Sequence, residues 1–93
     1  MPERMLFDYE MTDQPRVCRL SVTNLNLAPD GPESYPDRSS AATGSLVART
    51  AFSVEGVQAL QLEGGEALVT LAPEAIAEIV MEEVIEGLRD LFL

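Results

Sequence analysis

The feature that most constrains the fold is an amphipathic segment that begins at Pro73 and runs to the end of the chain. At the rotation of about 100° per residue that an α-helix imposes, its apolar and charged side chains separate into two arcs. The apolar arc contains Ile76, Ala77, Val80, Met81, Val84, Ile85, Leu88, Leu91 and Phe92. The opposite arc contains Glu78, Glu82, Glu83, Glu86, Arg89 and Asp90. Because Pro73 suits the first helical position, the pattern predicts a helix from Pro73 whose apolar arc packs on a sheet, with Gly87 allowing a close approach to that sheet.

Two segments near the amino terminus alternate between apolar and polar residues, which is typical of half-buried β-strands. The first spans residues 4–11, and its apolar side consists of Met5, Phe7, Tyr9 and Met11. The second spans residues 17–25, and its apolar side includes Cys18, Leu20 and Val22. Asp13 and Pro15, which lie between them, favour a hairpin turn. Cys18 is therefore interpreted as a small core residue and not as a reactive thiol.

The middle of the chain is punctuated by prolines and glycines. Residues 28–44 hold three prolines and two glycines without any usable period, which predicts a mobile loop. Ser45 can then cap a short helix that ends near Gly56, a residue free to adopt a positive φ. Two further alternating runs flank Gly64-Gly65, which predicts a second hairpin. This glycine pair is no phosphate-binding loop, because no Lys-Ser/Thr follows it and glutamates flank it.

These elements predict a single α+β domain over residues 1–93. The order ββαββα gives two layers: a four-stranded, mainly antiparallel sheet with two helices packed on one face.

The charge balance limits the partners and the chemistry. Sixteen acidic residues against six arginines give a net charge of −10, which disfavours nucleic acid and anionic membranes but leaves a basic protein surface open. The chain has no histidine, so Ser-His-acid and Cys-His nucleophiles are excluded, and its single cysteine excludes a CxxC pair. We therefore expect a protein that is not an enzyme, with no catalytic, cofactor or metal site. No signal peptide or membrane span is recognisable, so we expect a cytoplasmic protein.

The predicted closing helix offers a candidate surface for a protein partner. Glu78, Glu82 and Glu86 lie four residues apart on one face, and Ile79 interrupts them. This face is interpreted either as a docking surface for a basic partner or as a solvated face without a binding role. A weak surface for divalent cations is a further alternative, although glutamates alone seldom form a closed site. The turn at Asp13, Gln14 and Pro15 and the proline-rich residues 28–44 are the other candidate contact surfaces.

The run from Ser45 to Leu71, with its hairpin from Leu60 to Leu71, resembles a known family, and the resemblance extends over most of the chain. The matching runs are Ser45-Leu46-Val47-Ala48-Arg49, Ala51-Phe52-Ser53-Val54-Glu55-Gly56-Val57 and, after the hairpin, Leu71-Ala72-Pro73-Glu74-Ala75-Ile76. They resemble the amino-terminal domain of Nfu/NifU-like iron–sulfur cluster scaffold proteins, where a helix of small residues leads into "F-x-I-x-G-V" and "K-P-E-I" follows the hairpin. Asp13-Gln14-Pro15 stands where that family carries a "T-P-N-P-N" turn. The chain departs from the family in its single proline at that turn, its longer 28–44 segment and the missing aromatic residue before the last helix.

The resemblance implies an antiparallel four-stranded sheet with two helices and a role beside iron–sulfur cluster assembly. In the family, a separate carboxy-terminal domain ligates the cluster through a CxxC pair, which this chain lacks. The resemblance therefore implies a non-catalytic accessory module whose partners are iron–sulfur assembly proteins. Two alternatives stay open at this point: a self-associating domain with no link to iron–sulfur metabolism, and a small-molecule binder or enzyme with a buried carboxylate in a pocket. The oligomeric state is left open.

Overall fold

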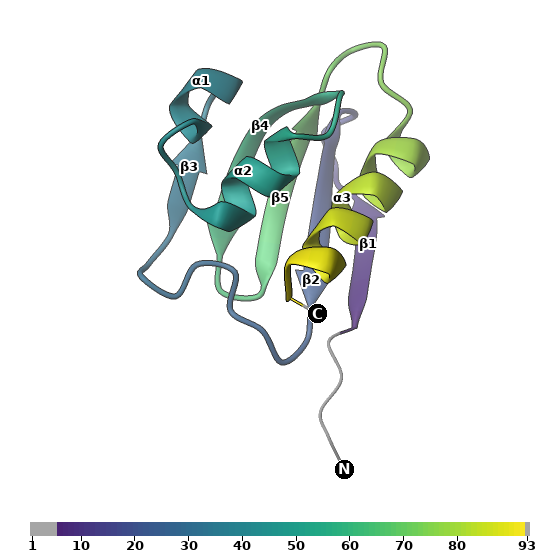
Figure 1. The fold of residues 1–93 in the computed structure, drawn as a ribbon. Coiled ribbons are helices and arrows are strands. Elements are labelled where there is room, and N and C mark those ends of the chain that lie inside the picture. The colour runs from purple at the N-terminus through teal and green to yellow at the C-terminus, as the bar shows by residue number, and fades with distance from the viewer. Residues whose placement is uncertain (1–5, 93) are drawn as a thin grey trace.

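The elements follow one another as an antiparallel sheet interrupted by helices. A computed structural model describes residues 6–92, and its strands are β1 (Phe7–Met11), β2 (Val17–Val22), β3 (Glu33–Tyr35), β4 (Val57–Glu63) and β5 (Glu66–Leu71). Its helices are α1 (Arg38–Ala41), α2 (Leu46–Phe52) and α3 (Ala77–Phe92). The strand order is β1-β2-β5-β4-β3, and every neighbouring pair is antiparallel. Helices α2 and α3 cover one face of the sheet (Figure 1). The α+β class is confirmed, but the count of four strands and two helices is wrong, since residues 6–92 contain five and three.

The first hairpin follows the predicted alternation. Met11 pairs with Cys18 and Tyr9 with Leu20, so their side chains share the helix-covered face of the sheet. Cys18, Leu20 and Val22 are buried, as predicted. The second strand ends at Val22 and not near Leu25. The expected positions of Arg4 and Met5 lie outside the described residues.

The prediction of a loop throughout residues 28–44 is wrong for two short parts of the segment, which form β3 and α1. Strand β3 pairs with β4 and forms one edge of the sheet, but its three residues are too few to show a period. Helix α1 is a single turn whose N-cap, Asp37, accepts a hydrogen bond from the Ser40 amide at 2.8 Å. The Tyr35 ring packs edge-on against Phe52, with 6.5 Å between ring centroids, and ties β3 to α2. The mobility of this segment stays a prediction.

The start of the last helix also differs from the prediction. Residues 72–75 form a turn in which the Ala75 amide donates to the Ala72 carbonyl, and the first bond of the helix joins the Val80 amide to the Ile76 carbonyl. Pro73 therefore lies in this turn and not at the first helical position. Val80 and the other core residues of α3 are buried, but Ile76 precedes the helix and is 61% exposed. Its assignment to the inward arc is wrong for this reason, and Phe92 at the other end is also exposed.

The core between sheet and helices is aliphatic, with Phe52 as its only fully buried aromatic side chain among residues 6–92. No polar or charged residue of this part of the chain is buried. Gly87 allows a close approach to α2, and not to the sheet as expected, because a Cβ atom there would lie 3.1 Å from Cγ2 of Thr50. In the described part of the chain, none of the helices has both the length and the apolar character that crossing a bilayer requires.

Candidate functional site

Cys18 and the carboxylates are the side chains of this chain best suited to ligate a metal ion. No group of three or more Cys, Asp or Glu side chains within residues 6–92 could hold a metal ion. Cys18 is fully buried, and its thiol donates a hydrogen bond to the Met11 thioether sulfur at 3.4 Å. Burial raises the pKa of this thiol, which disfavours the nucleophilic thiolate. The interpretation of Cys18 as a core residue is confirmed, and surface features are left as the candidate sites.

The most distinctive surface feature is a recess of about 350 Å³ beside the first turns of α3. We call it the α3 recess. It is built from three segments that meet there: the α2–β4 turn, the β5–α3 connection and α3 itself (Figure 1). Its apolar lining consists of Gly56, Ala72, Ala75, Ile76, Ile79 and Val80. Ile76 and Ile79 are 61% and 53% exposed, so two large aliphatic side chains face solvent here.

The shape of the α3 recess depends on Gly56. This residue has a φ of +103°, which L side chains rarely adopt, and its carbonyl accepts a hydrogen bond from the Ala72 amide at 2.8 Å. A Cβ atom on residue 56 would lie 2.9 Å from Cγ2 of Val80 and 3.2 Å from Cβ of Ala75. Glycine therefore lets the α2–β4 turn close against both the β5–α3 connection and the first turn of α3.

Three carboxylates also line the α3 recess. Glu55 comes from the α2–β4 turn, Glu74 from the β5–α3 connection and Glu83 from α3. All three side chains are exposed, and no arginine lines the recess. An apolar floor with a negatively charged rim is an arrangement suited to an apolar side chain that is flanked by positive charges.

The residues predicted to form one acidic face on the last helix point in two directions. Ile79 lies in the α3 recess, whereas Glu78 and Glu82 lie towards β1, where they act on Tyr9. Burial first, and then the carboxylates of Glu78 and Glu82, raise the pKa of the Tyr9 phenol. Glu86 is exposed further along the helix and lines neither feature. The structure therefore does not bring all four predicted residues of this face into one site.

The sequence did not identify four lining residues of the α3 recess as parts of a site. They are Ile76 in the apolar lining and the three carboxylates of Glu55, Glu74 and Glu83. Glu55 could not have been found, because it comes from a turn that is distant in sequence. Ile76 carried a signal, since Pro73-Glu74 also fits a β-turn with proline at its second position. Starting the helix after that turn would have placed Ile76 outside the buried arc.

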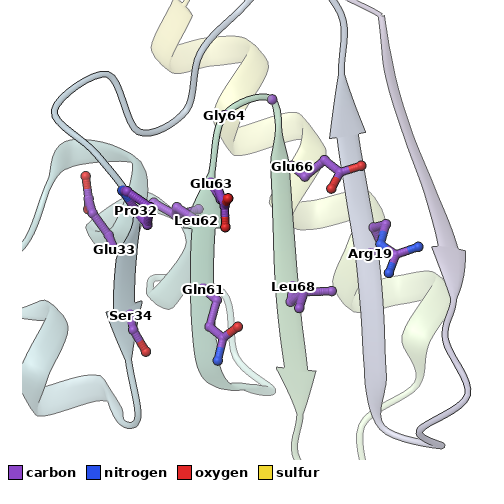
Figure 2. A pocket seen from close by; sticks show the side chains of 11 residues that line it. Arg19, Pro32, Glu33, Ser34, Gln61, Leu62, Glu63, Gly64, Glu66 and Leu68 are labelled. Atoms are coloured by element: carbon purple, nitrogen blue, oxygen red, sulfur yellow. The ribbon is translucent and has the colours of Figure 1, made fainter.

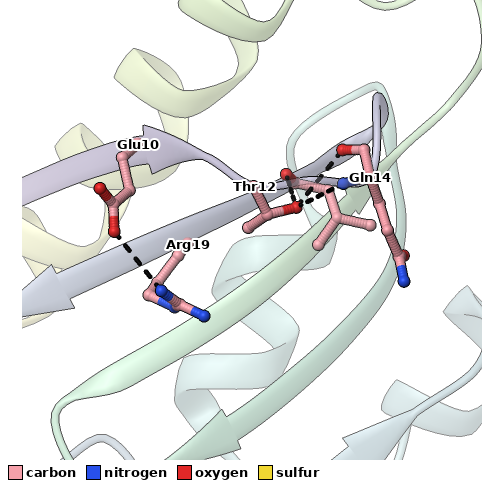
Figure 3. A network of polar contacts seen from close by, with 5 residues as sticks. Glu10, Thr12, Gln14 and Arg19 are labelled. Carbon is pink, nitrogen blue, oxygen red and sulfur yellow. Dashed lines mark hydrogen bonds and ion pairs between the residues drawn. The ribbon is translucent and has the colours of Figure 1, made fainter.

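The predicted turn site at Asp13, Gln14 and Pro15 is exposed, and hydrogen bonds of Thr12 hold the turn together. The Thr12 hydroxyl accepts from the Gln14 amide at 3.2 Å and donates to the Val17 carbonyl at 2.8 Å (Figure 3). Gln14 also lines a shallow hollow of about 300 Å³ on the open face of the sheet. None of the residues that line this hollow lines the α3 recess, so the two predicted surfaces are separate.

A larger hollow of about 740 Å³ also lies on the open face, over β4 and β5. Leu68 on β5 lies level with Gln61 on β4, and Glu63, Glu66 and Arg19 also line the hollow (Figure 2). The Arg19 guanidinium forms a 3.5 Å ion pair with Glu10, both ends of which are exposed (Figure 3). Such pairs are screened by solvent and contribute little to stability. None of the carboxylates that line this hollow is buried.

Comparison with known proteins identifies the fold. The chain matches no family model, and no curated protein matches its sequence. Among solved structures it is similar to the crystal structure of protein SAV1430 from Staphylococcus aureus, with a TM-score of 0.72 and 13% sequence identity. The match covers 92% of this chain and 99% of that one. At this level of identity the likeness establishes a shared fold and carries no information about activity.

Proposed function

We propose that this chain is a non-catalytic accessory module that binds another protein, and that its partners belong to iron–sulfur cluster assembly. The observation that carries the binding role is the exposure of Ile76 and Ile79 over the α3 recess. The link to iron–sulfur assembly rests on the resemblance of residues 45–76 to the Nfu amino-terminal domain. The cytoplasm is the compartment proposed for this role.

The contrast between floor and rim supports a protein partner. Single exposed apolar residues are ordinary on protein surfaces, but two neighbouring isoleucines over a concave lining form a patch. Interfaces commonly combine an apolar centre with a polar rim that excludes water. The buried position of Cys18 favours a module that contacts a cluster-carrying protein over one that carries the cluster itself.

Binding to purified iron–sulfur assembly proteins from the source organism, measured by surface plasmon resonance, tests this function. We expect Ile79→Ser to weaken binding to one of these proteins, whereas Leu46→Ser should not. Leu46 is a matched control because it is 59% exposed and lies on α2, outside the lining of the α3 recess. Failure of the wild-type protein to bind any of these proteins would refute the iron–sulfur role.

The second candidate function is self-association, and β1 is the observation that favours it. This strand is an edge of the sheet, and Leu6 and Met11 at its ends are 60% and 50% exposed. An unpaired edge is a template for a strand of another copy, although Asp8 and Glu10 oppose such pairing. Sedimentation at several concentrations tests it, since a Met11→Lys variant should dissociate a β1-mediated dimer. A strict monomer would contradict this alternative.

A further inference from the structure

The lining of the α3 recess restricts the chemistry of its occupant more than a flat apolar patch would. Its three rim carboxylates come from three different segments, all of which also contribute to the apolar lining. A side chain that enters the recess therefore meets both apolar atoms and negative charge. This arrangement selects an apolar residue that has positive charges on either side of it.

We propose that the α3 recess binds a basic amphipathic helix of a partner protein, which inserts one large aliphatic side chain between Ile76 and Ile79. Basic residues one turn before and after that side chain pair with Glu83 from α3 and with Glu55 or Glu74 from the other two segments. A helix suits this pattern because residues four apart project from the same face at about 5–6 Å spacing. This inference rests on the proposed function, in that the occupant is a protein segment and not a small molecule.

Charge argues against the competing occupants. A second copy of the chain that docked recess to recess would bring two sets of rim glutamates together, on a molecule whose net charge is already −10. A neutral apolar ligand would fill the floor but would leave the rim unused. Nucleic acid is repelled by the same carboxylates. A basic partner segment uses both the floor and the rim.

The test uses two fluorescent peptides of identical Ala, Leu and Lys composition. In one peptide, the leucines and flanking lysines are placed on one helical face, and in the other peptide the order is scrambled. Fluorescence anisotropy with the full chain should show saturable binding of the amphipathic peptide at low salt, and binding of the scrambled peptide at least tenfold weaker. Amide shifts in an NMR titration should concentrate at residues 55–56, 72, 74–76 and 79–83.

Variants then separate the floor from the rim. Ile79→Ser should weaken binding of the amphipathic peptide at least tenfold, and Glu83→Gln should reduce its dependence on salt. Two controls should leave binding unchanged: Leu46→Ser for apolar exposure and Glu63→Gln for a carboxylate on the open sheet face. Equal binding of both peptides, or an unchanged affinity for Ile79→Ser, would overturn the inference in favour of non-specific attraction to an acidic protein.

Failure of this inference can be told apart from failure of the proposed function. If an iron–sulfur assembly protein binds the wild type and Ile79→Ser equally, but not Glu82→Arg/Glu86→Arg, the partner uses another face of α3 and the recess proposal is wrong. If the amphipathic peptide binds and no assembly protein does, the recess proposal stands and the iron–sulfur role fails. A dimer in sedimentation that Ile79→Ser dissociates would identify a second copy as the occupant and would overturn the proposal.

Discussion

Gly56 and Val80 approach each other so closely that a Cβ atom on residue 56 would lie 2.9 Å from Cγ2 of the valine. Real Cβ contacts essentially never reach this distance, so any other residue at position 56 must displace the Val80 side chain or the backbone that carries it. The φ of +103° at Gly56 adds backbone strain for any L side chain. One glycine therefore permits both the backbone conformation of the α2–β4 turn and its close contact with Val80 and Ala75 in the α3 recess.

We predict that Gly56→Ala lowers the free energy of unfolding by about 3 kcal/mol, since backbone strain and overpacking each cost roughly 1–3 kcal/mol. Denaturant unfolding monitored by circular dichroism measures this. Combining it with Val80→Ala, which removes the clashing methyl groups, should give a double variant that is less destabilised than the sum of the two single changes. Additive effects would show that contact with Val80 does not contribute to the cost.

The Cys18 thiol should be protected in the folded protein. It is buried and bonded to the Met11 sulfur, so we predict that a thiol reagent labels it only at the rate of unfolding or of local opening. The rate measured by mass spectrometry should rise to that of a free thiol in denaturant. The control is a Cys introduced at exposed Ser53, in a Cys18→Ala background, which should react at once. Equally fast labelling of Cys18 in the native state would contradict the buried position.

Burial of this thiol also predicts a pH dependence. Because the pKa of Cys18 is raised in the folded protein, the folded state holds the proton where the unfolded state has lost it. The contribution to stability is therefore complete below the ordinary thiol pKa and declines as the pH rises above it. We expect the stability of the wild type to fall more steeply above about pH 8.5 than that of Cys18→Ala. Equal slopes in denaturant unfolding would refute this.

Much of the fold could be predicted from the sequence because its signals are local. Alternation over residues 17–22 specified which side of β2 is buried, and the rotation of 100° per residue specified the buried positions of α3 from Val80 to Leu88. Strand β3 could not be predicted, because its three residues owe their conformation to pairing with β4, which is distant in sequence. The capping box of Asp37 and Ser40 was the one local signal of α1.

The candidate site was less predictable than the fold. The sequence singled out Ile79, because an apolar residue interrupts an acidic face. It could not show that Ile79 and Glu55 line the same recess, since this depends on how α3 packs beside α2. It also grouped Glu78 and Glu82 with Ile79, whereas the packing of α3 on β1 directs these two carboxylates towards Tyr9. Local periodicity identifies a face of a helix, but only tertiary packing determines what lies beside that face.

The pKa of the Tyr9 phenol should report on the nearby carboxylates of Glu78 and Glu82. Its pKa is raised by burial and, to a smaller extent, by Glu78 and Glu82. In a Tyr35→Phe background, where Tyr9 is the one tyrosine left, we predict that Glu78→Gln and Glu82→Gln each lower the phenol pKa. Absorbance of the phenolate during alkaline titration measures it. Glu86→Gln is the control and should leave the pKa unchanged, and an equal fall in that variant would indicate a general effect of net charge.

The N-cap of α1 gives a prediction at acid pH. The pKa of Asp37 is lowered, chiefly by the hydrogen bond from the Ser40 amide and then by the Ser39 hydroxyl. A lowered pKa in the folded state means that this carboxylate stabilises the fold above its ordinary pKa, and that the contribution is lost as the pH falls through the folded value. We predict that the NMR shift of the Ser40 amide moves with a midpoint below about 3.9, the ordinary value for aspartate. In Asp37→Asn, which keeps an oxygen acceptor at the cap but no titrating group, this transition should disappear while α1 remains. A midpoint at or above the ordinary value would show that the cap does not form in solution.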